Sequence, residues 1–317
     1  MEQHKDKFSI KFYGVRGSHP NPSKHTLNYG GNTACVEINV NGHKVIIDAG
    51  TGIINLGNEL IKEYIASGTN NQNRKPISLT MLFSHTHHDH IQGFPFFKPA
   101  FVGTSTLHMF GAKSLNVNFA ETLSHSMFTP FFPVDLGEMA AQMHIRNFKE
   151  TEMLLLYPNR PEPEVRNLHR SKDEVSDDIA TVSCIKSYAH PKDGVLIFRI
   201  SWKGKSVVYA SDKESYIGGD SRLFSFARNT DVLIHDTQYT SDDYSSPITP
   251  KQGYGHSTPE MAVEAMKGAN AKKLIMFHYD PSYDDDLINQ ILSDTKKIYP
   301  DTIAAYEGLE IDLLPDK

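Results

Sequence analysis

Apolar residues in the first part of the chain follow patterns that are typical of β-strands. Residues 8–13 alternate between apolar and polar side chains, and residues 34–40 form a second strand that leads into Asn41-Gly42. That pair is a strong signal for a two-residue hairpin turn, so residues 43–47 are predicted to be the returning strand. Residues 77–83 are rich in apolar and β-favouring side chains, which predicts a buried strand.

Apolar residues at helical spacing predict helices between the strands. Residues 53–66 carry such a pattern and are predicted to form a helix that covers one face of a sheet. A second amphipathic helix is predicted at residues 114–125. Ser257 or Thr258 can cap a third helix, and a last one is predicted from 284 to 298.

The second half of the chain adds a further set of strands, several of which end at a histidine or an aspartate. The turn Lys203-Gly204 predicts a hairpin between two of them. These strands are predicted at residues 181–188, 195–202, 205–210, 231–234 and 272–277. The mixture of strands and helices predicts an α/β protein.

Length and composition place the chain among globular proteins. At 317 residues, with 39% hydrophobic and 22% charged residues, it can form one large domain with a sizeable core. We predict a single domain over residues 1–317 with an insertion around residues 104–180. Residues 159–178 are charged and contain two prolines, so this part of the insertion is predicted to be an exposed excursion in which His169 is solvated.

Charge and the absence of targeting patterns narrow the partners and the compartment. No apolar run is long enough to cross a bilayer, and residues 1–7 do not resemble a secretory signal, so we expect a cytoplasmic protein without a membrane partner. A net charge of −6 weighs against a long nucleic acid as the main partner. Cys35 and Cys184 are expected to be buried thiols rather than a disulfide framework. Whether the chain is a monomer or a homodimer stays open.

A dense group of candidate metal ligands follows the strand at residues 77–83. The stretch from His85 to His90 reads His-x-His-x-Asp-His, in which His85 and His87 can point the same way and Asp89 and His90 form a second pair. Imidazole with carboxylate suits zinc, manganese, iron or nickel, and two such pairs suit two ions rather than one. We predict two divalent ions, zinc first, with manganese or iron as alternatives.

This motif resembles the signature of the metallo-β-lactamase fold superfamily, and further segments support the resemblance. The stretch Asp48-Ala49-Gly50-Thr51-Gly52 is similar to the superfamily's first motif, in which the aspartate supports the metal loop by hydrogen bonds. The resemblance implies a four-layer αββα sandwich with a metal site at one edge of two sheets. His87 at the second motif position resembles the hydrolase branch rather than the diiron oxygen reductases of the same fold.

Carried over residue by residue, the resemblance implies the ligands of a dinuclear hydrolase. One ion would be held by His85, His87 and His190, and the other by Asp89, His90 and His278, with Asp212 as the bridge. His190, Asp212 and His278 each end a predicted strand, as the cluster itself does, so all of them can converge on one sheet edge. Such a site works through a metal-bridging hydroxide as the nucleophile, and Asp89 is also expected to have a catalytic role.

The substrate class follows from weaker similarities. Gly255-His256-Ser257-Thr258 resembles the phosphodiesterase branch that includes ribonuclease Z, in which the matching histidine assists the leaving group. His256 is therefore expected to be a general acid. The segments around Arg16 and Asn32 also look like bacterial hydrolases of this branch, and both residues are expected to bind substrate. A small phosphodiester, such as a cyclic nucleotide or a short nucleotide, is the preferred substrate.

Three alternatives remain open at the level of sequence. A lactonase or thioester hydrolase would use the same metals without a particular need for His256. A tRNA-processing endonuclease would cleave precursor tRNA with a steep salt dependence. A protein that only binds metal would be inert toward esters, lactones and phosphodiesters.

Overall fold

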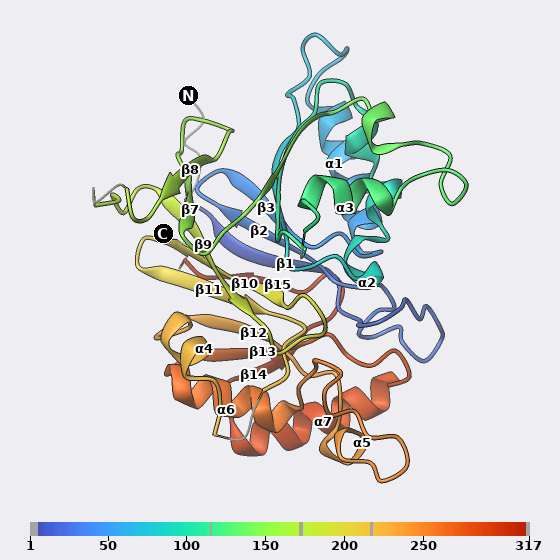
Figure 1. The fold of residues 1–317 in the computed structure, drawn as a ribbon. Helices are drawn as coiled ribbons and strands as arrows, with labels where there is room; N and C mark the ends of the chain where they lie inside the picture. Colours follow the sequence, from blue (N-terminus) through green and yellow to red (C-terminus); the bar gives the residue numbers. More distant parts are fainter. Residues whose placement is uncertain (1–5, 115, 171–173, 216–217, 315–317) are drawn as a thin grey trace.

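The computed structural model describes residues 6–114, 116–170, 174–215 and 218–314 (Figure 1). Two mixed β-sheets pack face to face with helices on both outer sides, which confirms the four-layer αββα sandwich. The outer helices are α1 (Ile53–Ala66) and α3 (Phe119–His125) on the first sheet, and α4 (Ser221–Phe226), α6 (Pro259–Ala269) and α7 (Asp285–Ile298) on the second.

The first sheet is built mainly from the N-terminal half of the chain, with one strand from the C-terminus at its edge. Its order is β15 (Glu310–Asp312), β1 (Phe8–Gly14), β2 (Cys35–Val40), β3 (His43–Ile47), β4 (Ser78–Phe83), β5 (Thr106–Gly111) and β6 (Gln142–Asn147). Strands β2 and β3 form the predicted hairpin, with both turn residues, Asn41 and Gly42, in the left-handed conformation.

The second sheet contains the remaining strands. Its order is β14 (Thr302–Ala304), β13 (Lys273–Phe277), β12 (Val232–Asp236), β11 (Lys205–Ala210), β10 (Val195–Trp202), β9 (Ala180–Ser187), β7 (Glu152–Leu156) and β8 (Glu164–Asn167). Strands β10 and β11 form the hairpin predicted across Lys203-Gly204. The described chain also has short helices α2 (His88–Ile91) and α5 (Ser241–Tyr244), and 3-10 turns at Phe94–Phe96, Lys98–Phe101 and Leu136–Glu138.

Two apolar layers hold the sandwich together. Between the sheets, Phe12 of β1 packs against Phe277 of β13 with ring centroids 5.9 Å apart, and Phe277 also meets Tyr209 of β11. On the outer side of the first sheet, α1 buries Leu56 and Leu60 against a separate cluster, as its apolar stripe predicts. These two layers hold the strands whose ends carry the site residues in fixed positions.

Two predicted elements differ from the structure. The helix predicted at residues 114–125 begins only at Phe119, because Ser114 and Val117 hydrogen-bond each other in a tight turn; Leu115 lies outside the described residues. Within the predicted excursion at residues 159–178, Glu164–Asn167 pairs with β7 as an edge strand, so backbone pairing orders part of a polar segment. Residues 171–173 of that segment lie outside the described part.

The predicted helix cap and the two buried thiols are confirmed. Thr258 caps α6 by accepting a hydrogen bond from the Met261 N–H, and Pro259 occupies the first turn. Cys35 and Cys184 are both buried and unpaired. Among the described residues, none of the helices has the length and apolar character needed to cross a bilayer.

Parallel pairing places several strand ends at one edge of the sandwich. In the first sheet β3 pairs in parallel with β4, and in the second β11, β12 and β13 are parallel neighbours. The carboxyl ends of parallel strands meet at the same edge, which is where open α/β sheets place their ligands. The residues that follow these strands are therefore brought together.

Candidate metal centre

The loop that follows β4 carries the histidine cluster. Ser84 to His87 leave the strand, and the short helix α2 then presents Asp89 and His90; it is closed by the His90 N–H donating to the His87 carbonyl at 3.0 Å. Because the backbone changes from strand to helix between the two pairs, His85 and His87 point to one position at the edge of the sandwich, and Asp89 and His90 point to another.

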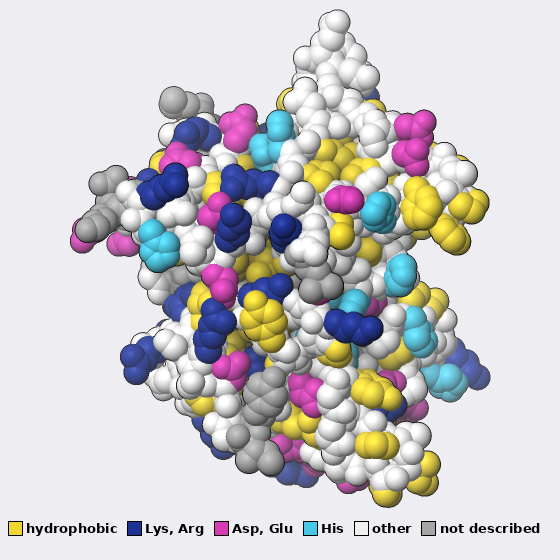
Figure 2. All heavy atoms as spheres, in the orientation of Figure 1, with side chains coloured by type: hydrophobic (Ala, Val, Ile, Leu, Met, Phe, Trp, Pro, Cys, Tyr) yellow, Lys and Arg dark blue, Asp and Glu magenta, His cyan; other side chains and the backbone are white. Residues whose placement is uncertain are grey.

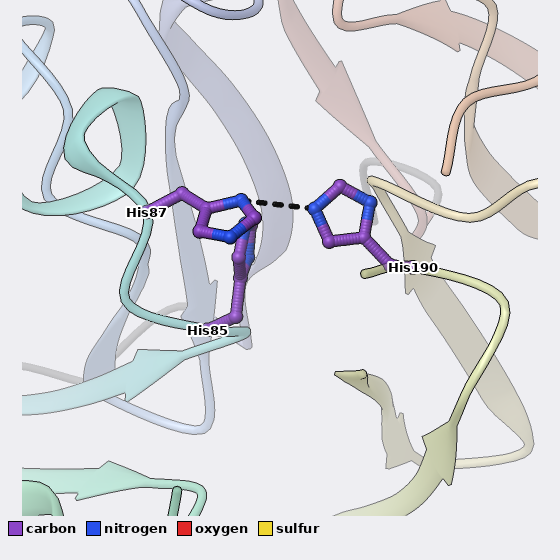
Figure 3. Close-up of side chains that lie close together, drawn as sticks. All are labelled: His85, His87 and His190. Carbon is purple, nitrogen blue, oxygen red and sulfur yellow. Dashed lines mark hydrogen bonds between the residues drawn. The ribbon is translucent and has the colours of Figure 1, made fainter. Parts of the chain in front are cut away.

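The first group of ligand-type side chains consists of three histidines. His85, His87 and His190 offer ring nitrogens that lie within 4.8 Å of one another. Figure 3 shows the three rings pointing toward a common centre, with His190 Nε2 only 2.9 Å from His87 Nδ1. His190 comes from the segment after β9, more than a hundred positions along the chain from His85, so only the fold brings them together.

The second group combines two carboxylates with two histidines. Asp89, His90, Asp212 and His278 offer atoms within 4.8 Å of one another, and all four side chains are buried. His278 Nε2 lies 3.1 Å from Asp89 Oδ2 and 3.2 Å from His90 Nε2.

Asp212 faces both groups with different oxygens. Its Oδ2 is 3.6 Å from His85 Nε2 and 3.8 Å from His190 Nε2. Its Oδ1 is 3.0 Å from His90 Nε2 and 3.2 Å from His278 Nε2. This is the placement expected of a carboxylate shared by two ions, the role that the resemblance to the superfamily implies for Asp212.

Asp48 holds the loop after β4 through hydrogen bonds, as expected of a supporting aspartate. It accepts hydrogen bonds from the Ser84 N–H at 2.7 Å, the Ser84 hydroxyl at 2.8 Å and the Tyr209 hydroxyl at 2.8 Å. It also lies 2.8 Å from His90 Nδ1. Tyr209 and Ser84 are contributors that sequence reasoning missed.

Hydrogen bonds assign the tautomers of three histidines. His90 Nδ1 donates to Asp48, His190 Nδ1 donates to the Gly255 carbonyl at 3.0 Å, and His85 Nδ1 donates to Ser84, whose own proton goes to Asp48. In each neutral ring Nε2 then carries a lone pair directed at the centre. His85 Nε2 is buried without a hydrogen-bond partner among the described residues. Lone pairs and carboxylates that converge in this way are suited to bind cations, so the side chains fit divalent metal.

The acid–base properties of the two groups differ. Burial holds the pKa of His85 well below its usual range and lowers the pKa of His87 to about 4, so both are neutral at pH 7. Burial also acts to lower the pKa of His278, but the neighbouring carboxylates, Asp212 first, raise it to about 10. Without a metal ion a proton occupies the second group, and metal binding there has to displace it.

A carboxylate that the sequence analysis did not assign, Asp236, completes the site. It ends β12 and its Oδ2 lies 2.7 Å from His256 Nδ1. It also accepts hydrogen bonds from the backbone N–H groups of Asp212, Gln238 and Ser257. Asp212, Asp236, His256 and His278 form a third group within metal-ligand distance, but donors already occupy the Asp236 oxygens. Asp236 ends β12, which runs parallel to β11, the strand before Asp212. A carboxylate at that strand end was the sequence feature that could have identified it as a site residue.

Three site residues leave their strands in the left-handed conformation. Asp48, Asp212 and His278 have φ values of 61°, 52° and 66°, and each follows the end of a strand directly or within two residues. Such conformations are uncommon for residues other than glycine and concentrate at functional sites. Here they turn each side chain out of the sheet and toward the shared centre.

The two predicted substrate-binding residues do not face the site. Arg16 is fully buried, and its guanidinium donates to the backbone carbonyls of Gly30, Asp280 and Tyr283, so it holds loops together and the prediction for Arg16 is wrong. The Asn32 side-chain amide donates to Glu307 at 3.0 Å and does not line the cavity at the site. His169 is exposed, as predicted.

An open cavity of about 420 Å³ gives access to the centre. It is lined by Ser18, Thr86, His87, His88, Asp89, Asp212 and His256. The walls are polar and include members of both ligand groups together with His256. A substrate in this cavity would contact the candidate general acid and the metal ligands at once.

Residues 43–279 match a family model described as a β-lactamase superfamily domain. Ribonuclease Z from Picrophilus torridus is 27% identical to this chain, and the alignment covers 96% of each sequence. Among solved structures, zinc-bound PqqB from Methylobacterium extorquens superposes with a TM-score of 0.64 at 12% identity, covering 96% of this chain and all of that one. The short form of human tRNase Z gives a TM-score of 0.59 at 16% identity, covering 97% and 100%.

Proposed function

The chain belongs to the β-lactamase superfamily, and on that premise we propose that it is a metal-dependent phosphodiesterase that cleaves RNA. The observation that carries the proposal is the extent of the similarity to ribonuclease Z, which spans nearly the whole of both chains. The polar cavity with a paired histidine and aspartate beside two metal-ligand groups supports the same chemistry.

The proposed ligands are those that the geometry groups. His85, His87 and His190 would hold one ion, Asp89, His90 and His278 the other, and Asp212 would contact both. When bound, the ions activate water and neutralise charge on the phosphoryl oxygens. Zinc suits this set of imidazole and carboxylate donors, and manganese or iron are the alternatives.

The protein side chains supply the proton for the departing group. In hydrolysis a water oxygen bonds to phosphorus while the bond to the leaving oxygen breaks, so that oxygen needs a proton. His256 lines the cavity and is the donor in this proposal. Asp236 holds its Nδ1 and so leaves Nε2 to deliver the proton.

The proposal favours the alternative of the sequence analysis over its preferred small phosphodiester. The net charge of −6 describes the whole chain, whereas an RNA touches only the surface around the site. The net charge therefore does not exclude a long nucleic acid as a partner.

A small phosphodiester remains a second candidate because of the charge distribution. Figure 2 shows Lys and Arg side chains interspersed with Asp and Glu side chains on the visible face rather than gathered in one dense basic patch. An RNA-binding surface normally depends on such clusters.

A comparison of activity on four classes of substrate tests the proposal. The full chain, supplied with Zn²⁺ or Mn²⁺, is given precursor tRNA, 3′,5′-cyclic AMP, a lactone and a thioester, with Asp212→Ala as the inactive control. We expect cleavage of the precursor tRNA with kcat/KM falling steeply as salt rises. Hydrolysis of cyclic AMP with intact precursor tRNA would establish the second candidate instead, and hydrolysis of the lactone or thioester alone would overturn both.

A further inference from the structure

A lysine and two tyrosines near His256 have no role in the chemistry described above. The Lys251 ammonium lies 5.7 Å from the centre of the Tyr239 ring and 5.6 Å from that of Tyr254. Tyr239 is buried, whereas Tyr254 is 56% exposed. The Tyr239 ring packs edge-on against His256 at 5.8 Å, so the lysine lies one ring away from the candidate proton donor.

The loop that carries these residues is fixed to the site. The Glu214 carboxylate accepts hydrogen bonds from the Gly253 N–H at 2.8 Å, the Gly255 N–H at 3.0 Å and the Tyr244 hydroxyl. The Gly255 carbonyl in turn accepts from His190 Nδ1. Tyr254 therefore lies between two glycines that are fixed by hydrogen bonds. Its ring is exposed to solvent although the loop itself is held in place.

The cation is left available for a ligand. Glu214, which lies in the segment after β11 and holds this loop, is engaged by the three donors above. Among the described residues, Lys251 has ring contacts and no carboxylate within ion-pair distance. A lysine ammonium held near aromatic rings without an ion-pair partner is suited to bind an anionic group.

We propose that Tyr254 and Lys251 form a subsite for the nucleotide that carries the leaving oxygen. The base stacks on the exposed Tyr254 ring, and the other phosphate of that nucleotide binds the Lys251 ammonium. Stacking on exposed aromatic rings is a general mode of binding unpaired bases. The position follows from chemistry, because the group that His256 protonates must lie next to His256. This inference rests on the proposed phosphodiesterase function and specifies its substrate as a nucleotide with at least two phosphates.

Three dinucleotides separate the contributions. Unphosphorylated ApA is compared with pApA and ApAp, which carry an extra phosphate on opposite nucleosides, and the products show which nucleoside carried the leaving oxygen. The wild-type chain should favour the compound whose extra phosphate lies on that nucleoside. Lys251→Gln should remove this preference by raising KM roughly tenfold with little change in kcat, as expected for one charge-assisted contact.

Matched variants isolate each contact. Lys203 also lies over an aromatic ring, 4.6 Å from that of Trp202, but in the hairpin at the far end of β10 and β11, so Lys203→Gln should keep the preference. Tyr254→Ala should raise KM for all three dinucleotides roughly tenfold, and Tyr254→Phe should restore it because the ring remains.

The outcomes distinguish this inference from the function on which it rests. A preference that survives Lys251→Gln, no preference in the wild-type chain, or an unchanged KM in Tyr254→Ala would overturn the subsite while leaving the phosphodiesterase intact. Failure of the wild-type chain to cleave any dinucleotide or RNA would overturn the proposed function, and the subsite with it.

Discussion

Asp236 Oδ2 lies 2.7 Å from His256 Nδ1, and both side chains are buried at the edge of the candidate metal centre. The same carboxylate is 3.5 Å from His278 Nδ1 and accepts the Asp212 N–H at 3.1 Å. One aspartate therefore orients the candidate proton donor and contacts two candidate metal ligands. Asp236 therefore lies between the candidate metal ligands, Asp212 and His278, and His256, the candidate proton donor for the leaving group.

Replacing His256 should affect substrates according to their leaving groups. A positioned general acid contributes on the order of 10²–10⁴-fold, and a strongly basic alkoxide needs it most. His256→Ala should therefore keep both metals, lose roughly that factor on an alkyl or cyclic phosphodiester, and lose much less on a nitrophenyl phosphodiester. Kinetics on the two substrates with metal analysis of the variant measure this. Equal losses on both, or loss of an ion, would remove the general-acid role.

Asp236→Asn should reduce activity through His256. The substitution replaces the acceptor of the His256 Nδ1 proton, and a loss of roughly 10–100-fold is expected for a residue that orients a catalytic group. The informative measurement is the double variant His256→Ala with Asp236→Asn. If the two residues act as a unit, the double variant is no slower than His256→Ala alone. Fully additive losses would show that Asp236 acts on the metal ligands instead.

Asp212→Ala should reduce metal content and rate together. Its two oxygens face different ligand groups, so its removal takes a negative charge and a shared ligand from both. His169→Ala is the matched control, because His169 is an exposed histidine outside the site. Elemental analysis and turnover of the two variants provide the comparison. Comparable damage from both substitutions would contradict the assignment of the ligands.

Gly255→Ala should displace His190. Gly255 has a φ of +91°, and a Cβ at this position would lie 2.2 Å from His190 Nδ1. Gly253→Ala is the control, since Gly253 has a similar φ of +81° but open space around its Cβ. Both variants should lose stability of roughly 1 kcal/mol from the strained backbone, but only Gly255→Ala should lose metal. Thermal unfolding and metal analysis test the pair, and equal metal content would contradict the contact.

The proposed ligand set could be assembled from the sequence because most of the information is local. His85, His87, Asp89 and His90 fall within six positions, and few structures other than a metal site account for that pattern. His190, Asp212 and His278 could be added because each follows a predicted strand. Parallel pairing then brings those strand ends to one edge, as the structure has it.

The errors concern side chains whose partners are distant in the sequence. Arg16 beside glycines resembled a residue available to substrate. In the structure it is buried, and its Nε and Nη1 donate to three backbone carbonyls, two of them from the C-terminal part of the chain. The strand predicted at residues 231–234 stops short of Asp236, and Asp236 was not identified as the partner of His256, twenty positions later. Tyr209 reaches Asp48 across the two sheets. Such pairings depend on how strands cross the sandwich, which local patterns do not contain.

The central claim is that two metal ions at this cluster drive hydrolysis of an RNA phosphodiester. The most direct measurement is a titration of metal into chelator-treated protein with precursor tRNA cleavage and bound metal followed together. The account predicts that cleavage rises with occupancy and reaches its maximum at two ions per chain. Full cleavage at one ion per chain, or no cleavage of RNA at two, would contradict it.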